Sequence, residues 1–359
     1  MKHYLLCTFL FSLLSLSVVS QQRTLSIVPE PAELIRGKGS FLLDAKKIIV
    51  AENNDAGLRH LAETFTGWLS PATGFQLKIA DHAVTSVKSI ELSLNASIKD
   101  IKTEEGYLLE ISSNRIHLSA AKPAGIFYGL QTLRQLLPPA IEYQSKQAVV
   151  WEIPAVKITD YPRFGWRGLL LDVSRHFFTK EFVKKYVDEM ARYKFNILHL
   201  HLTDDQGWRI QIKSFPGLTE TGAWRVPRTG RWWTYEQPKP GEAATYGGFY
   251  TQDDIREMVQ YARERNVAIL PEIDVPGHSL AAIASYPYLS ATGYLYPVNP
   301  GSKFYNIEDN TLNPADERVY DFLDKVFGEI AQLFPYPYIH IGGDECTKTF
   351  WKKSAVVQD

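Results

Sequence analysis

The second half of the chain alternates between short apolar runs and helices with one apolar face. The apolar runs are short enough for buried strands and lie at residues 165–174, 196–202, 267–273 and 338–341. Apolar residues recur at helical spacing in the intervening segments 179–193, 253–265 and 316–334. Repeated strand–helix units predict a (β/α) barrel of the TIM type, whose functional groups lie at the carboxyl ends of the strands.

The first of these helices has a clear predicted start and a clear buried face. Thr179 is a favourable N-cap residue, because its hydroxyl can accept a hydrogen bond from the first helical turn. The apolar stripe that follows is expected to be buried, and consists of Phe182, Val183, Tyr186, Val187 and Met190.

The first half of the mature chain mixes strands and helices in a less regular order. Strands are predicted at 47–51, 76–80, 107–111 and 115–119, and helices at 55–69 and 124–137. The pattern changes near Asp160-Tyr161-Pro162-Arg163. We therefore predict a small α+β domain at 21–155, followed by a barrel domain at 156–359.

The first twenty residues have the features of a signal peptide. Lys2 and His3 precede an almost unbroken apolar run from Tyr4 to Val19, and Val18-Val19-Ser20 offers small-residue spacing for cleavage. The run is short for a membrane span, so no integral span is expected. The sequence predicts an exported protein, periplasmic or extracellular.

Composition excludes some classes of partner. The 359 residues include 39 basic and 40 acidic side chains, giving a formal charge of -1, so no strong field attracts nucleic acid. Without the signal peptide, Cys346 is the single cysteine, which excludes a CxxC metal site. We predict no cofactor and no bound metal.

Ionisable side chains follow all four predicted barrel strands. They lie within Asp172–His176, His199–Asp205, Glu272–His278 and His340–Glu345. The last segment places Asp344 and Glu345 side by side after two glycines that permit a tight turn. Adjacent carboxylates repel one another when ionised, so one of them can retain a proton and act as a general acid.

Taken together, these segments resemble glycoside hydrolase family 20, the β-N-acetylhexosaminidases. The resemblance rests on LDVSRH at 171–176, LHLHLTDDQGW at 198–208, PEIDVPGH at 271–278 and HIGGDE at 340–345, and on the amino-terminal YGLQTL at 128–133. It implies retaining hydrolysis of terminal β-linked N-acetylglucosamine or N-acetylgalactosamine. In this chemistry the substrate's acetamido oxygen attacks the anomeric carbon and forms an oxazolinium intermediate.

The resemblance also implies roles for individual residues. Glu345 matches the general acid, and Asp344 matches the residue that orients the acetamide and stabilises the oxazolinium. The residues expected at the substrate site are Arg175, which would hold sugar hydroxyls, Asp204 and His278, which would support the acid, and Trp208, which would shape the pocket.

The number of predicted strands departs from the family pattern. An eight-stranded barrel needs about 250 residues, whereas four barrel strands are predicted before Asp359. We therefore expect the amino-terminal half of a barrel. Its unpaired parallel edge would allow a second copy to associate.

Two other functions fit parts of the sequence. The chain could be an inactive or merely sugar-binding fragment. It could also be a metal-dependent hydrolase, because His199 and His201 share one face of a strand and could be joined by His278, Asp274 or His340.

Overall fold

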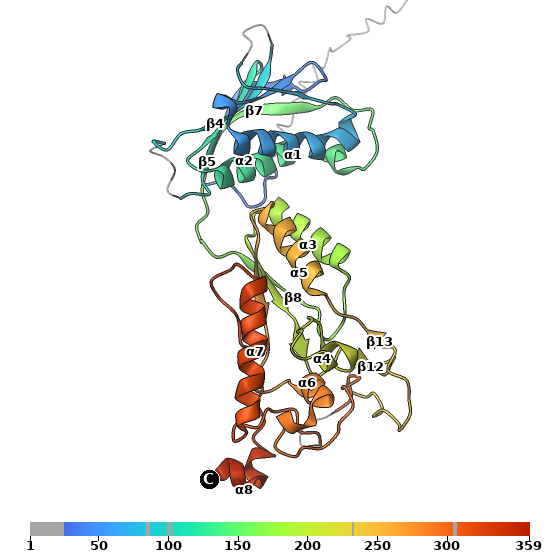
Figure 1. Ribbon diagram of the computed structural model, residues 1–359. Coiled ribbons are helices and arrows are strands. Elements are labelled where there is room, and N and C mark those ends of the chain that lie inside the picture. The colour runs from blue at the N-terminus through green and yellow to red at the C-terminus, as the bar shows by residue number, and fades with distance from the viewer. Residues whose placement is uncertain (1–24, 84–86, 99–100, 102, 232, 304–306) are drawn as a thin grey trace, which may run out of the picture.

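The described chain forms two units, one above the other in Figure 1. The computed structural model describes residues 25–83, 87–98, 101, 103–231, 233–303 and 307–359. The predicted signal peptide, residues 1–20, lies outside this part of the chain. Among the described residues, no helix combines the length and the apolar character that crossing a membrane requires.

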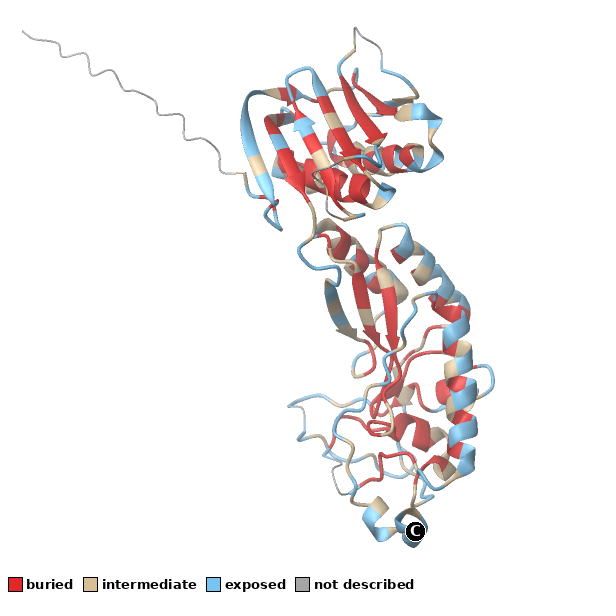
Figure 2. Ribbon diagram, turned by 90° about the vertical axis from the view of Figure 1, so that its left-hand side faces the viewer, coloured by how far each residue is buried: buried red, intermediate tan, exposed pale blue. Residues whose placement is uncertain are grey.

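The amino-terminal unit is a seven-stranded mixed sheet covered on one face by two helices (Figures 1 and 2). Across the sheet the strands are β1 (Glu33–Leu42), β7 (Glu152–Asp160), β5 (Tyr107–Ile111), β6 (Arg115–Ala120), β4 (Ser89–Leu94), β2 (Ile48–Ala51) and β3 (Lys78–Ala80). The helices are α1 (Ala56–Thr73) and α2 (Pro123–Leu136). They pack together through Trp68 and Phe127, whose rings lie edge to face at 5.7 Å.

Local sequence explains the bounds of α1. The Asp55 side chain accepts a hydrogen bond from the N–H of Leu58 and caps the first turn. The helix ends where Gly74 adopts a left-handed conformation with φ 72°. The predicted helix at 55–69 is therefore present and extends one turn further.

The second unit contains three adjacent parallel strands, in the order β14 (Ala268–Glu272), β9 (Ile197–His201) and β8 (Gly168–Asp172). Helices α3 (Lys180–Arg192), α5 (Gln252–Arg263) and α7 (Glu317–Leu333) pack along this unit, as Figure 1 shows. Shorter elements occupy the connections: hairpin strands β10 (Thr203–Asp204) and β11 (Gly207–Trp208), paired strands β12 (Trp224–Arg225) and β13 (Tyr246–Gly247), and helices α4 (Gly217–Glu220) and α6 (Leu280–Ser285). The short helix α8 (Ala355–Gln358) is the last element. The predicted α/β architecture is confirmed, although the described residues do not close a barrel.

The fourth predicted barrel strand, 338–341, is much shorter than expected. It is reduced to a parallel bridge between His340 and Glu272. Backbone hydrogen bonds still join it to the segment of β14, with His340 N–H donating to Pro271 at 2.9 Å and Ile273 N–H donating to His340 at 3.0 Å. Tyr338 and Ile341 are exposed.

The predicted buried stripe of α3 is correct at three of its five positions; Phe182 is exposed, and Tyr186 is only half-buried. Thr179 caps the helix, and Val183, Val187 and Met190 are buried. Phe182 is exposed and stacks on Phe178 with ring centroids 4.5 Å apart. The prediction that Phe182 is buried was wrong. Its ring packs on the ring of Phe178 at the surface and does not enter the core.

Polar contacts join the two units. Lys194 Nζ lies 2.7 Å from the Asp160 carboxylate, and the Arg167 guanidinium lies 2.6 Å from Glu105. Asn196 also donates to Glu105, at 3.0 Å. These contacts lie at the amino ends of the barrel strands, so they leave the carboxyl ends of the strands open for chemistry.

Candidate active site

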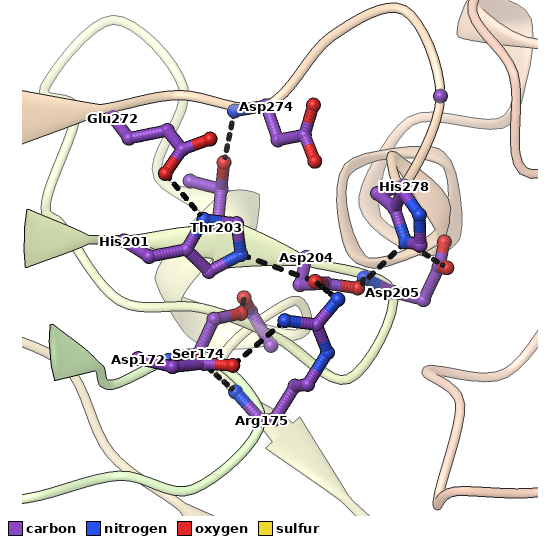
Figure 3. A network of polar contacts seen from close by, with 12 residues as sticks. Asp172, Ser174, Arg175, His201, Thr203, Asp204, Asp205, Glu272, Asp274 and His278 are labelled. Atoms are coloured by element: carbon purple, nitrogen blue, oxygen red, sulfur yellow. Dashed lines mark hydrogen bonds and ion pairs between the residues drawn. The ribbon is translucent and has the colours of Figure 1, made fainter. Parts of the chain in front are cut away.

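Four ionisable residues lie side by side at the carboxyl ends of the parallel strands. Asp172 of β8 is in register with His201 of β9, and His201 is in register with Glu272 of β14. His340 forms the bridge to Glu272. Because the strands are parallel, their ends meet at the same edge of the sheet, where Figure 3 shows the side chains of Asp172, His201 and Glu272.

Asp204 is the centre of this network (Figure 3). Its carboxylate lies 2.6 Å from Arg175 Nη2, 3.1 Å from His201 Nε2 and 3.1 Å from His278 Nδ1. Burial by itself would raise the pKa of Asp204, but the contacts with His201, His278 and Arg175 hold that pKa below its usual range. Asp204 is therefore a buried anion at neutral pH.

Arg175 bridges two carboxylates. Its Nη1 lies 2.7 Å from Asp172 and its Nη2 lies 2.6 Å from Asp204. The Asp172 carboxylate also accepts the backbone N–H groups of Ser174 and Arg175, at 3.0 and 2.9 Å. The side chain remains 37% exposed, so the guanidinium is both fixed in position and reachable from solvent.

His278 connects the aspartates with Glu345. Its Nδ1 faces Asp204 at 3.1 Å and Asp205 at 3.0 Å, and its Nε2 lies 3.3 Å from the Glu345 carboxylate. Burial opposes a charge on His278, yet hydrogen bonds to Asp204 and Asp205 raise its pKa to about 11. A protonated imidazole thus stands beside Glu345, whose side chain is 65% exposed.

Asp274 lies behind the turn that carries Asp344 and Glu345. Its backbone N–H donates to Thr203 Oγ1 at 3.0 Å, and its Oδ1 accepts from the N–H of Gly343 at 2.9 Å. The other oxygen, Oδ2, is buried and has no hydrogen-bond partner among the described residues. Burial raises the pKa of Asp274 to about 6.

A second group of histidines surrounds Glu272. His199 Nε2 and His201 Nδ1 lie 2.7 and 2.8 Å from one carboxylate oxygen, and His340 Nδ1 lies 3.1 Å from the other. Ligand atoms of His199, Glu272 and His340 lie within 4.8 Å of one another, as a metal site would require. Hydrogen bonds to Asp204 and Glu272 outweigh burial and raise the pKa of His201 to about 10. Its positive charge disfavours a cation at this place.

An arginine that we had not predicted supports the loops of the site. Arg209 is fully buried, and its guanidinium donates to the backbone carbonyls of Ser174 and Ala223, each at 2.6 Å. A Cβ atom on Gly207 would lie 2.1 Å from the same guanidinium, so glycine is required there. The loops after β8 and β9 are thereby held together.

The structure brings most of the predicted site residues together. Arg175, Asp204, His278 and Glu345 form one continuous chain of contacts, and Asp344 precedes Glu345 on the exposed turn. Trp208 does not join them. It is 3% exposed, donates from Nε1 to the Ile210 carbonyl at 2.7 Å and packs edge to face on Phe322 of α7. Its position gives no support to a role in shaping the substrate pocket.

Sequence reasoning missed Asp205 as a member of the site. It follows Asp204 directly and is fully buried, in contact with His278. The doubled aspartate after a buried strand was the available signal, since two adjacent carboxylates are rarely buried unless each has partners.

Comparison with known families agrees with this arrangement. The profile of "Glycosyl hydrolase family 20, catalytic domain" matches residues 164–359, and that of "Glycosyl hydrolase family 20, domain 2" matches residues 24–161. The chain belongs to glycosyl hydrolase family 20. The network around Asp204 therefore lies in the catalytic domain of a family 20 protein.

Similar proteins cover nearly all of the chain. The chain is 36% identical over 335 residues to a β-hexosaminidase of Porphyromonas gingivalis and 38% identical over 338 residues to one of Vibrio furnissii. Each match covers 93% of this chain, but only 40% and 51% of those two proteins. The chain thus spans about half the length of the relatives it matches.

Solved structures show the same family fold. The family 20 β-N-acetylhexosaminidase of Streptomyces coelicolor A3(2) matches with a TM-score of 0.79 at 37% identity, covering 92% of this chain and 63% of that one. A mutant β-hexosaminidase of Streptomyces plicatus matches equally well and was solved in complex with the product GlcNAc.

Proposed function

We propose that this chain is a β-N-acetylhexosaminidase that removes terminal β-linked N-acetylglucosamine or N-acetylgalactosamine from oligosaccharides and glycoconjugates. The observation that carries the proposal is the contact between His278 and Glu345, with His278 held in turn by buried aspartates. A protonated imidazole next to a carboxyl group changes the pKa of that carboxyl group, which must give up a proton and take one back during the reaction.

The proposed reaction retains configuration and uses the substrate as its own nucleophile. Glu345 protonates the leaving oxygen while the acetamido oxygen attacks the anomeric carbon, so the glycosidic bond breaks as the oxazolinium ring forms. Asp344 accepts the acetamide N–H and stabilises the positive charge of the ring. The Glu345 carboxylate then takes a proton from water, which opens the ring and releases the sugar.

Arg175 is suited to hold the terminal sugar. Its guanidinium is fixed by Asp172 and Asp204 and is partly exposed, so hydroxyl groups can reach it without further ordering of the side chain. Prior fixation of this kind reduces the entropy lost when the substrate binds.

The test is release of nitrophenol from 4-nitrophenyl N-acetyl-β-glucosaminide by residues 21–359. Glu345→Gln should abolish turnover, whereas Glu181→Gln on the exposed face of α3 should leave it unchanged. Absence of turnover in all three proteins would contradict the proposal. Binding of GlcNAc, followed by calorimetry, would then identify a sugar-binding fragment.

We also propose that two copies associate through the open side of the barrel sheet. β8, with Leu170 52% exposed, is at one edge of the three-stranded sheet, and the segment that bridges to β14, with Tyr338 and Ile341 63% and 59% exposed, is at the other edge. Exposed apolar residues beside an unpaired strand edge favour pairing with another chain. Sedimentation should show a dimer that Ile341→Lys dissociates, and a monomer at all concentrations would contradict this.

Export to the periplasm or the extracellular space is a further part of the proposal, supported by the apolar segment after Lys2. Fractionation of expressing cells, with sequencing of the mature amino terminus, should place the protein outside the cytoplasm with residue 21 first.

A metal-dependent hydrolase is the second candidate, because His199, Glu272 and His340 are close enough to share a cation. Chelator treatment separates the two proposals. Full activity of metal-free protein would support the glycosidase, whereas activity restored only by added Zn²⁺ would support the metal-dependent hydrolase.

A further inference from the structure

Two buried arginines lie close together beside the loop that follows β8. Arg209 is fully buried, and Arg225 of β12 is 4% exposed. Nη2 of Arg209 and Nη1 of Arg225 both donate to the carbonyl oxygen of Gln206, at 3.2 and 3.3 Å. Two buried cations this close repel one another and have lost their hydration, so the arrangement is costly unless negative charge is supplied.

The described residues supply little negative charge to this pair. In that part of the chain neither guanidinium forms an ion pair with a carboxylate, and Asp172 acts on both only through its longer-range field. Asp172 is itself in contact with Arg175, at 2.7 Å. Burial, followed by the charge of Arg225, lowers the pKa of Arg209 to about 10. The surroundings of the pair are therefore positive.

The two arginines differ in how far their N–H groups are used. The Arg209 guanidinium donates to several backbone carbonyls, including those of Ser174 and Ala223. Within the described ranges, the Gln206 carbonyl is the one hydrogen-bond acceptor of the Arg225 guanidinium, which carries several N–H donors. Arg225 therefore has both an uncompensated charge and donors that are still available.

Tyr246 and His176 lie between Arg225 and the solvent. The half-buried ring of Tyr246, on β13, has its centroid 4.6 Å from the Arg225 guanidinium. The Tyr246 hydroxyl lies 2.9 Å from Nδ1 of His176, which is exposed and follows Arg175 directly. Burial and then the charge of Arg225 lower the pKa of His176, with Arg209 acting in the same direction and Asp172 against it. His176 therefore reports on the charge at this place.

We infer that Arg225, Tyr246 and His176 form a binding site for a small oxyanion such as sulfate or phosphate, beside the loop that carries Arg175. An oxyanion supplies the missing negative charge, and its oxygens accept several guanidinium N–H groups at once. A neutral hydroxyl group would use the donors but leave the charge of the arginine pair uncompensated. The inference does not rest on the proposed function, because the site uses neither Asp344 nor Glu345.

The test follows the titration of His176 by NMR in residues 21–359 labelled at histidine. Sodium sulfate is compared with sodium chloride at equal ionic strength, so that general screening is the same in both. We expect sulfate to raise the pKa of His176 by about one unit, in a saturable manner. Arg225→Gln should abolish this difference between the salts. The control is Arg256→Gln on α5, where the side chain is 54% exposed, and it should preserve the difference.

A phosphorylated sugar identifies the source of the anion. Half-saturation by N-acetylglucosamine 6-phosphate at a concentration about tenfold below that of inorganic phosphate would assign the oxyanion to a sugar bound at Arg175 as well. Equal concentrations would assign it to a free anion, and both results support the site.

The same His176 titration in sulfate and in chloride would overturn the inference, as would an undiminished sulfate effect in Arg225→Gln. If Arg225→Gln fails to fold, Tyr246→Phe replaces it, because phenylalanine keeps the ring beside Arg225 and removes the hydroxyl. The half-saturating sulfate concentration should then rise about threefold to tenfold, and an unchanged concentration would overturn the inference. None of these measurements requires hydrolysis, so failure of the proposed function would be seen separately.

Discussion

The Asp274 carboxylate accepts a hydrogen bond from the N–H of Gly343, and the same oxygen would lie 1.8 Å from a Cβ atom on Gly342. The turn that presents Asp344 and Glu345 is therefore in direct contact with a buried side chain. Gly342 and Gly343 have φ values of 66° and 103°, which side chains other than glycine rarely adopt. The two glycines allow the acidic pair to approach β14 this closely.

Gly342→Ala should distort this turn. A left-handed alanine costs about 1–2 kcal/mol, and its methyl group would collide with Asp274. We expect a loss of unfolding free energy of at least that size in urea titrations, together with loss of hydrolysis. Gly328→Ala is the matched control, because Gly328 lies in α7 with open space around it. That substitution should stabilise the protein by about 0.5–1 kcal/mol. Equal effects of the two changes would contradict our account of the turn.

Asp274→Asn should stabilise the protein at neutral pH and not in acid. The folded-state pKa of about 6 lies above the ordinary value of 3.8, so the folded protein holds this proton more tightly than the unfolded chain. Stability is therefore lost as pH rises from about 4 through 6, by up to about 3 kcal/mol. Asparagine avoids this cost and can still accept the Gly343 hydrogen bond through its amide oxygen.

Urea titrations at pH 4 and pH 7.5 measure the effect of Asp274→Asn. The variant should gain stability over the unmodified protein at pH 7.5 and much less at pH 4. Asp253→Asn, whose carboxylate is 93% exposed, is the control and should show no such difference. A gain or loss that is the same at both pH values would exclude Asp274 as the titrating group.

The sequence predicted those features that depend on neighbouring residues. Short segments of sequence are enough to recognise polar side chains at strand ends, the cap at Thr179 and the carboxylates after Gly343. Because parallel strands end at a common edge of the sheet, the polar side chains at their ends were expected to lie together. The family motifs then supplied roles for Arg175 and Glu345, which the geometry leaves as proposals.

Features that depend on distant residues escaped prediction. Strand β1 pairs with β7, more than a hundred residues away, and its charged, glycine-containing sequence shows little strand periodicity. Trp208 is adjacent to the site in sequence, yet the β10–β11 hairpin turns it towards α7. The Asp205 carboxylate accepts hydrogen bonds from the N–H of Leu280 and from the Asn310 side chain. Neither contact can be inferred from local spacing.

The ion pair between Lys194 and Asp160 should contribute strongly to the stability of the two-unit chain. Lys194 is 6% exposed, and its Nζ lies 2.7 Å from Asp160 and 2.9 Å from the hydroxyl of Tyr107. Tyr107 donates in turn to Asp160 at 2.8 Å. Lys194→Met would leave a buried carboxylate with a neutral donor in place of its cation, at a cost of about 3–5 kcal/mol.

A double-mutant cycle in urea separates the pair from its surroundings. Lys194→Met combined with Asp160→Asn should cost less than the sum of the single changes, with a coupling of about 0.5–3 kcal/mol, because the double variant has no unpaired buried charge. Lys157→Met is the control. Its pair with Glu110 is about half exposed, with side chains 56% and 48% accessible, and should contribute 0 to about 1 kcal/mol. If Lys194→Met cost no more than Lys157→Met, the contact would not hold the two units together, and other contacts between them, such as those of Glu105 with Arg167 and Asn196, would do so.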